Sequence, residues 1–142
     1  MNRWSEIKAK EVILDRMLAN DAFSQWLEIH VDLIAENSVE ISCQITESMT
    51  NGFLVAHGGI VFSLCDSALA FHSNSWGRKA LSIDTSINHL SPIKVGDKIT
   101  AITSIIKVGK SLGNFLIEAF NQDGKKVAVM KGMVFYTGDC WE

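Results

Sequence analysis

The segment from Ile60 to Trp76 limits most strongly what this chain can fold into. It has the length of a helix and is apolar on most of its circumference, and Gly77 follows it as a helix stop. A helix of this kind is buried, because it has no wide polar face to turn toward water. Its most apolar part, Ile60 to Phe71, is too short to span a bilayer and contains Asp66. The sequence therefore predicts a central helix that other elements enclose.

The rest of the chain supplies those elements mainly as strands. Apolar and polar residues alternate, or β-branched residues accumulate, in residues 27–34, 39–45, 81–90, 98–108, 114–120 and 127–136. We therefore predict an α+β fold in which an antiparallel β-sheet wraps around one long central helix, with a further helix at the N-terminus. We expect a single domain over residues 1–142, with the N-terminal helix at about residues 3–20 and the core at about residues 27–137. The edges of such a sheet favour edge-to-edge dimerisation.

Composition excludes several classes of function. The net charge is −3 and the basic residues are scattered, which gives no surface for nucleic acid or an anionic membrane. Cys43, Cys65 and Cys140 are far apart and suit reduced thiols, and the N-terminus carries charges where a signal peptide would be apolar. We therefore expect a cytoplasmic protein. His30, His72 and His89 are isolated in the sequence and are interpreted as structural, so no metal site is expected.

Asp66 lies in the middle of the apolar helix, and a carboxylate is costly to bury unless it is paired or used. In one interpretation it belongs to a single polar stripe that nearby serines mark. In the other it is a working carboxylate, which Ser63 and Ser67 keep ionised by donating hydrogen bonds. The sequence leaves both interpretations open.

The pair Gly58-Gly59 opens the helix and also has two interpretations. The glycines relieve a strained turn, or they let a substrate reach backbone N–H groups and the positive end of the helix dipole, which stabilise an oxyanion. Eight residues of helix would separate Gly58 from Asp66 by roughly 12 Å at about 1.5 Å per residue. An oxyanion donor and a base must each lie within about 3 Å of the reacting centre. If both residues act, they act from different subunits of a two-fold dimer.

Two polar residues, Asn51 and His57, lie in the loop that leads into the helix. Asn51-Gly52 is also the signature of an ordinary tight turn. A Ser-His-Asp triad is disfavoured, because the sequence contains no G-x-S-x-G motif.

The pattern N-G-x(4)-H-G-G-x(2)-F-S-L-x-D, from Asn51 to Asp66, resembles the PaaI-type (phenylacetate-degradation) hotdog thioesterases. The resemblance extends from about residue 27 to residue 136. It implies a hotdog homodimer, usually paired into a homotetramer, that hydrolyses acyl-coenzyme A thioesters and needs no cofactor, since coenzyme A is part of the substrate.

The resemblance also implies roles for single residues. Asp66 corresponds to the catalytic carboxylate, acting as general base on water or as nucleophile, and the Gly58 N–H corresponds to the oxyanion donor. Asn51 resembles the residue that orients the water or the thioester, and His57 shapes the loop. Ser82 matches a hydroxyl that assists the water in some relatives.

One departure concerns the coenzyme A moiety. Many relatives have Leu-Arg-Pro where this chain has Leu90-Ser91-Pro92, so a basic contact near the phosphates is missing. The candidates to replace it are Lys94, Lys107 and Lys110, with Ser111 nearby; each lysine has the alternative of being an ordinary solvated residue near a turn.

Two other functions fit the same fold. A hotdog enoyl-coenzyme A hydratase or dehydratase would need a catalytic histidine paired with an acid or asparagine, for which His57 is the one candidate. A non-catalytic acyl-coenzyme A binding module would keep the pocket without turnover, and the presence of Asp66 argues against it.

Overall fold

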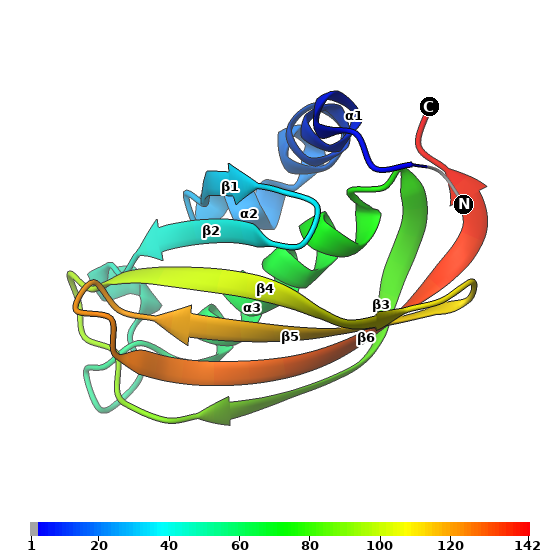
Figure 1. Ribbon diagram of the computed structural model, residues 1–142. Helices are drawn as coiled ribbons and strands as arrows, with labels where there is room; N and C mark the ends of the chain where they lie inside the picture. The colour runs from blue at the N-terminus through cyan, green and yellow to red at the C-terminus, as the bar shows by residue number, and fades with distance from the viewer. Residues whose placement is uncertain (1–2) are drawn as a thin grey trace.

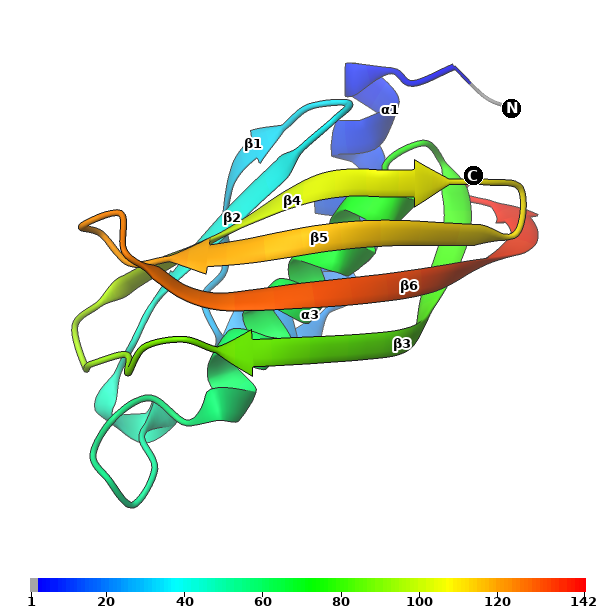
Figure 2. The ribbon, with the colours of Figure 1, turned by 60° about the horizontal axis from the view of Figure 1, so that its bottom comes forward.

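A six-stranded antiparallel sheet curls around one long helix in the computed structural model, which describes residues 3–142 (Figures 1 and 2). The strands are β1 (His30–Ile34), β2 (Val39–Gln44), β3 (Arg78–His89), β4 (Lys98–Val108), β5 (Leu112–Phe120) and β6 (Lys126–Cys140). They lie in the order β1-β2-β4-β5-β6-β3, and every neighbouring pair is antiparallel. The predicted fold class is confirmed.

The central helix, α3 (Gly58–Asn74), packs against strands β2 to β6. It begins at Gly58, the first of the glycine pair that the sequence places at its opening, and His57 caps it: the His57 Nδ1 accepts a hydrogen bond from the Gly59 N–H at 2.9 Å. It ends at Asn74, two residues before the predicted end at Trp76, and Gly77 then takes a left-handed φ of 88° that an L-residue rarely adopts. Of the helices within residues 3–142, none combines the length and the apolar character needed to cross a membrane.

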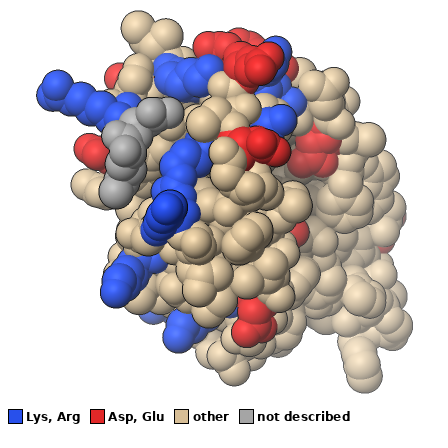
Figure 3. Space-filling model, turned by 90° about the vertical axis from the view of Figure 1, so that its right-hand side faces the viewer, with Lys and Arg blue, Asp and Glu red and all other residues tan. Residues whose placement is uncertain are grey.

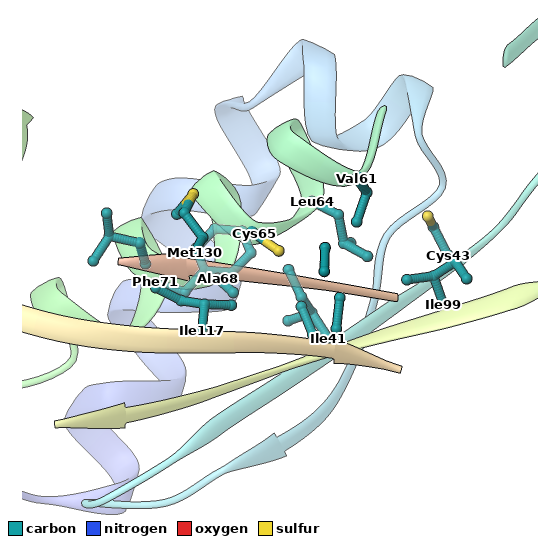
Figure 4. Packing of buried hydrophobic residues seen from close by; sticks show 14 of the residues in the cluster. Ile41, Cys43, Val61, Leu64, Cys65, Ala68, Phe71, Ile99, Ile117 and Met130 are labelled. Atoms are coloured by element: carbon teal, nitrogen blue, oxygen red, sulfur yellow. The ribbon is translucent and has the colours of Figure 1, made fainter. Parts of the chain in front are cut away.

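The core lies between α3 and the concave face of the sheet (Figure 4). From the helix it takes buried side chains that include Leu64, Cys65, Ala68, Leu69 and Phe71. Strand β6 passes so close that a Cβ added at Gly132 would lie 2.5 Å from the Leu69 Cδ2. Glycine is therefore needed at that position for the helix to reach this depth.

The N-terminal segment is more helical than the sequence predicts. It forms α1 (Glu6–Lys10), a π-helical stretch η1 (Glu11–Met17), a short 3₁₀ stretch η2 (Leu18–Asn20) and a further helix α2 (Ala22–Trp26). The expected strand at residues 27–34 is wrong in its first part, since β1 begins at His30. Asp21 caps α2 by accepting from the Ser24 N–H at 2.9 Å, and Leu27 ends it. This local cap overrides the alternating pattern.

Strands β1 and β3 form the two edges of the sheet. Strand β3 is twelve residues long and leaves Leu81 and Ile83 68% and 57% exposed. A long apolar edge of this kind offers unpaired backbone groups to a further strand.

Candidate active site

The first turn of α3 leaves one backbone donor free. The Gly59 N–H is taken by the His57 Nδ1, and the Ile60 N–H donates to the His57 carbonyl at 2.9 Å. No acceptor for the Gly58 N–H is found within residues 3–142. The N-terminal end of α3 at Gly58, here called the helix mouth, therefore presents a single N–H together with the positive end of the helix dipole.

This N–H lies at the wall of an open cavity of about 390 Å³. The loop before α3 contributes Asn51 to the lining, and the end of β3 with the segment after it contributes His89 and Ser91. The remaining lining residues are apolar or glycine. The structure thus brings the predicted residues Asn51 and Gly58 together and adds His89, which the sequence analysis interprets as a structural histidine.

Asn51 both forms a turn and lines this cavity. Its Oδ1 accepts from the Phe53 N–H at 2.9 Å, and its own N–H donates to the Val55 carbonyl at 2.8 Å. Within residues 3–142 no partner is found for its Nδ2, which remains available as a donor.

Asp66 lies outside the lining of this cavity, two helical turns further along α3. It belongs to a half-exposed stripe of the helix made of Phe62, Ser63, Asp66, Ser67 and Ala70. Burial raises the pKa of the Asp66 carboxyl above its ordinary value, and the negative charge of Asp21 raises it further. A carboxylate with a raised pKa is a better proton acceptor than an ordinary surface carboxylate.

Ser63 and Ser67 do not donate hydrogen bonds to Asp66, although the interpretation of Asp66 as a working carboxylate expects them to. The Ser63 hydroxyl donates to the Gly59 carbonyl at 2.7 Å, and the Ser67 hydroxyl bonds to the Ser24 hydroxyl at 2.9 Å. The expectation that they donate to Asp66 is therefore wrong. Helical geometry explains the difference for Ser63, whose hydroxyl reaches the carbonyl four residues back.

The remaining predicted residues are spread over the two ends of the sheet. Ser82 lies seven residues before His89 in β3, roughly 23 Å away at about 3.3 Å per residue. Lys94 lies near the cavity end, in the loop before β4, where its N–H donates to the Asp97 Oδ2 at 2.9 Å. Lys107, Lys110 and Ser111 lie at the β4–β5 hairpin, at the opposite end. One chain alone therefore does not gather these residues around Gly58.

The hairpin end also holds a cation that the sequence reasoning missed. The Arg78 guanidinium lies 3.8 Å from the centre of the Tyr136 ring and donates to the Gly109 and Lys110 carbonyls. Figure 3 shows this end of the molecule, where Lys and Arg side chains gather along one side. Arg78 and the hairpin are far apart in the sequence, so no local pattern predicts their contact.

A second cavity of about 370 Å³ lies on the other side of His57 and Gly59. Phe23 and Trp26 of α2 line it, with their ring centres 5.7 Å apart. The sequence does not predict this cavity, because it does not predict α2. As to metals, no group of three or more potential metal ligands is found among the described residues 3–142.

A curled antiparallel sheet around one helix, with a free N–H at the helix mouth beside a cavity, defines the hotdog class of acyl-group enzymes. The family model described as "Thioesterase superfamily" matches residues 53–128. The chain belongs to this family, as a PaaI-type hotdog thioesterase, and the prediction of a thioester hydrolase is confirmed.

Individual relatives agree with this assignment. The chain is 36% identical to acyl-coenzyme A thioesterase PaaI of Escherichia coli over 116 residues, which cover 82% of this chain and 83% of PaaI. The solved structure of the E. coli PaaI protein matches with a TM-score of 0.91 at 33% identity, covering 96% of this chain and 98% of that one. A hypothetical thioesterase protein from Streptococcus pneumoniae, solved with coenzyme A, matches with a TM-score of 0.76 at 25% identity, covering 79% of this chain and 88% of that one.

Proposed function

We propose that this protein hydrolyses acyl-coenzyme A thioesters to a free acid and coenzyme A. The observation that carries the proposal is the free Gly58 N–H at the wall of a mostly apolar cavity, on the same helix as a carboxylate of raised pKa. The substrate class is supported by the name of E. coli PaaI and by the coenzyme A in the streptococcal relative.

Each active site takes its two key groups from two subunits. Gly58 and Asp66 are eight residues apart in one continuous helix, roughly 12 Å along its axis, so one thioester cannot contact both within a chain. Antiparallel pairing of two β3 edges would run the strands in opposite directions. The Gly58 end of one chain would then lie beside the Ser82 end of the other.

The reaction follows from these positions. Asp66 accepts a proton from water as the water oxygen attacks the thioester carbon, and the carbonyl π electrons move onto the oxygen held at the Gly58 N–H. The tetrahedral intermediate then collapses and the C–S bond breaks. The coenzyme A thiolate takes up the proton that Asp66 accepted from water. Asn51 orients the water or the thioester, His57 holds the loop through its contact to Gly59, and Ser82 assists the water.

The same two-fold arrangement suggests which residues bind the coenzyme A moiety. In a two-fold dimer the partner's hairpin end comes toward the cavity, so that Lys107, Lys110 and Ser111 of one subunit and Lys94 of the other are the contacts we propose for the phosphates. The reaction needs no further cofactor, because a thioester is already activated. We place the enzyme in the cytoplasm, as a homodimer that pairs into a homotetramer.

The test is a thiol-release assay over about a dozen acyl-coenzyme A esters, including aryl-acetyl, medium-chain and long-chain groups, with an enoyl ester followed by its absorbance. Thiol release from at least one ester, with no hydration of the enoyl group, supports the proposal. Tight binding of every ester without thiol release would instead assign a binding module. An active and stably monomeric variant of the β3 edge would contradict the two-subunit site.

A further inference from the structure

The helix mouth supplies fewer donors than an oxyanion needs. A thioester oxygen that takes on a full negative charge is stabilised by more than one preorganised donor in enzymes that transfer acyl groups. Here the Gly59 N–H is occupied by the His57 Nδ1 and the Ile60 N–H by the His57 carbonyl, so the Gly58 N–H is the donor of this turn that has no partner within residues 3–142. A second donor has to come from another element that reaches Gly58.

His89 is the side chain in that position. It is the last residue of β3 and pairs with Ala128, whose side chain is buried on the face of the sheet that packs against α3. Its ring lies against Gly58 so closely that a Cβ added there would be 3.1 Å from the Cε1 and 3.2 Å from the Nε2. No hydrogen bond to either ring nitrogen is found within residues 3–142.

The lining of the cavity offers few side chains that could be this second donor. Of the residues that line it, His89 is the one with an ionisable side chain, and it lies on the same wall as Gly58. Asn51 is the other strong donor of the lining: its Oδ1 accepts from the Phe53 N–H, and its Nδ2 stays free within residues 3–142. The three atoms nearest to a Cβ added at Gly58 nevertheless all belong to the His89 ring, so we assign His89 the contact beside the Gly58 N–H.

We infer that His89 is a second oxyanion donor, whose ring N–H and the Gly58 N–H together hold the thioester oxygen. This inference rests on the proposed thioesterase function. A neutral imidazole carries one N–H, and a carbonyl oxygen has two lone pairs, so both donors bind the same oxygen without a proton changing place. Both hydrogen bonds strengthen as negative charge collects on that oxygen, and both weaken again when the C–S bond breaks.

The kinetic test compares two substitutions of His89. His89→Phe keeps a ring against Gly58 but has no donor, and lowers kcat on the order of 100-fold with little change in KM, because the lost bond acts mainly in the transition state. His89→Gln keeps an N–H donor and retains kcat within about tenfold of the wild type. The matched control is His30→Phe on the opposite edge strand, where an exposed histidine is replaced without any effect on kcat.

A binding test separates this inference from the proposed function, because it needs no turnover. We would titrate ¹⁵N-histidine-labelled protein with two analogues of the best ester of the panel, or of hexanoyl-coenzyme A if none is turned over. One is a ketone in which CH₂ replaces the sulfur, and the other is a thioether that lacks the carbonyl. The ketone, and not the thioether, shifts the His89 ring-nitrogen signals.

Each outcome decides one of the two claims. If wild-type protein releases thiol but His89→Phe keeps kcat within about twofold, or raises KM alone, the inference is wrong and the thioesterase proposal stands. If both analogues shift His89 equally, the contact is to another part of the ligand and the inference is again wrong. If no ester is hydrolysed and neither analogue binds, both the function and the inference fall.

Discussion

The two ends of α3 both carry polar groups, but they use them in opposite ways. At the C-terminal end the side chains of His72, Ser73, Asn74 and Ser75 are buried and all of them are hydrogen-bonded. At the N-terminal end the polar groups around Gly58 face a cavity, and the Gly58 N–H has no partner within residues 3–142.

The difference separates stability from chemistry along one helix. A fully paired buried polar group fixes the structure, and its loss leaves a partner unsatisfied. A donor that faces a cavity without a partner contributes nothing to folding and is free to bind a ligand. We therefore expect substitutions near Asn74 to lower stability and substitutions near Gly58 or Asp66 to lower activity.

The largest effect is expected for Asp66→Asn. Removal of the general base lowers kcat by roughly 1,000-fold. Because burial and Asp21 raise the pKa of Asp66, its ionised form is unfavourable in the folded state, so the neutral amide leaves the free energy of unfolding equal or higher at pH 7. Thiol release and urea unfolding measure the two quantities. Activity within tenfold of the wild type in a folded dimer would rule out Asp66 as the base.

Asn74→Ala tests the paired end. The Asn74 side chain accepts from the Ala80 N–H at 2.9 Å and from the Trp141 Nε1 at 2.9 Å, and donates to the Ala70 carbonyl at 2.8 Å. Its loss leaves buried groups unpaired and lowers the free energy of unfolding by about 2–4 kcal/mol, with kcat of the folded protein unchanged.

The matched control is Asn121→Ala. Asn121 also accepts two backbone hydrogen bonds, from Asp123 and Lys125, but in an exposed turn where water replaces them. We expect a loss below about 1 kcal/mol there. Equal losses at both positions would contradict the role assigned to the buried network.

Two glycine substitutions sharpen the comparison. A Cβ at Gly132 would lie 2.5 Å from the Leu69 Cδ2, so Gly132→Ala overpacks the core and lowers stability by about 1–3 kcal/mol without changing kcat. Gly58→Ala keeps stability but displaces the His89 ring, and we expect kcat to fall roughly tenfold. Thermal unfolding and thiol release on both variants give the comparison, and a reversed pattern would break it.

The smallest effect is a pH dependence from His72. Burial lowers the pKa of His72 below its ordinary value of 6.5, against a weaker opposing effect of its hydrogen bond to the Glu36 carbonyl. The unfolded chain therefore takes up a proton first, and stability falls as the pH drops below about 6.5 until the pKa of the folded state is passed. The slope reaches at most about 1.4 kcal/mol per pH unit.

Urea unfolding at pH 7.5 and 5.5 measures this loss. The experiment uses the Asp66→Asn background, because the raised pKa of Asp66 acts in the opposite direction: the folded state takes up that proton first. Adding His72→Phe should flatten the slope between the two pH values. A slope that persists in this variant would assign the effect to another group.

The sequence predicts the parts of this molecule that long apolar patterns specify. The central helix follows from residues that are apolar all round, and the later strands from their alternation. Helix α2 was missed because five residues with one Asp21 cap form too short a pattern to outweigh the alternation that follows.

The site was less predictable, because residues far apart in the sequence contribute to it. His89 contacts Gly58, which lies thirty-one residues earlier in the chain. In the sequence it is as isolated as a structural histidine, so nothing marks it as part of the site. Strict alternation puts Ser82 and His89 on opposite faces of β3. A bulge between Ser82 and Asp84 shifts the count by one, and both then pair with β6 residues that face the helix. Only the register of the folded sheet contains that information.

The central claim, that each site combines Gly58 of one subunit with Asp66 of the other, is tested most directly by mixing two inactive variants. Gly58→Pro removes the N–H at the first position of α3, which tolerates proline, and His57 already has the φ of −59° and ψ of 136° that a residue before proline prefers. Gly58→Ala is the control that adds a Cβ and keeps the N–H.

Gly58→Pro and Asp66→Asn are unfolded together, refolded and assayed for thiol release. Half of the dimers are then mixed, and each mixed dimer holds one site with both native groups, so about a quarter of the wild-type activity returns. Activity that stays at the level of the two separate variants, in a mixture shown to contain mixed dimers, would contradict the two-subunit site.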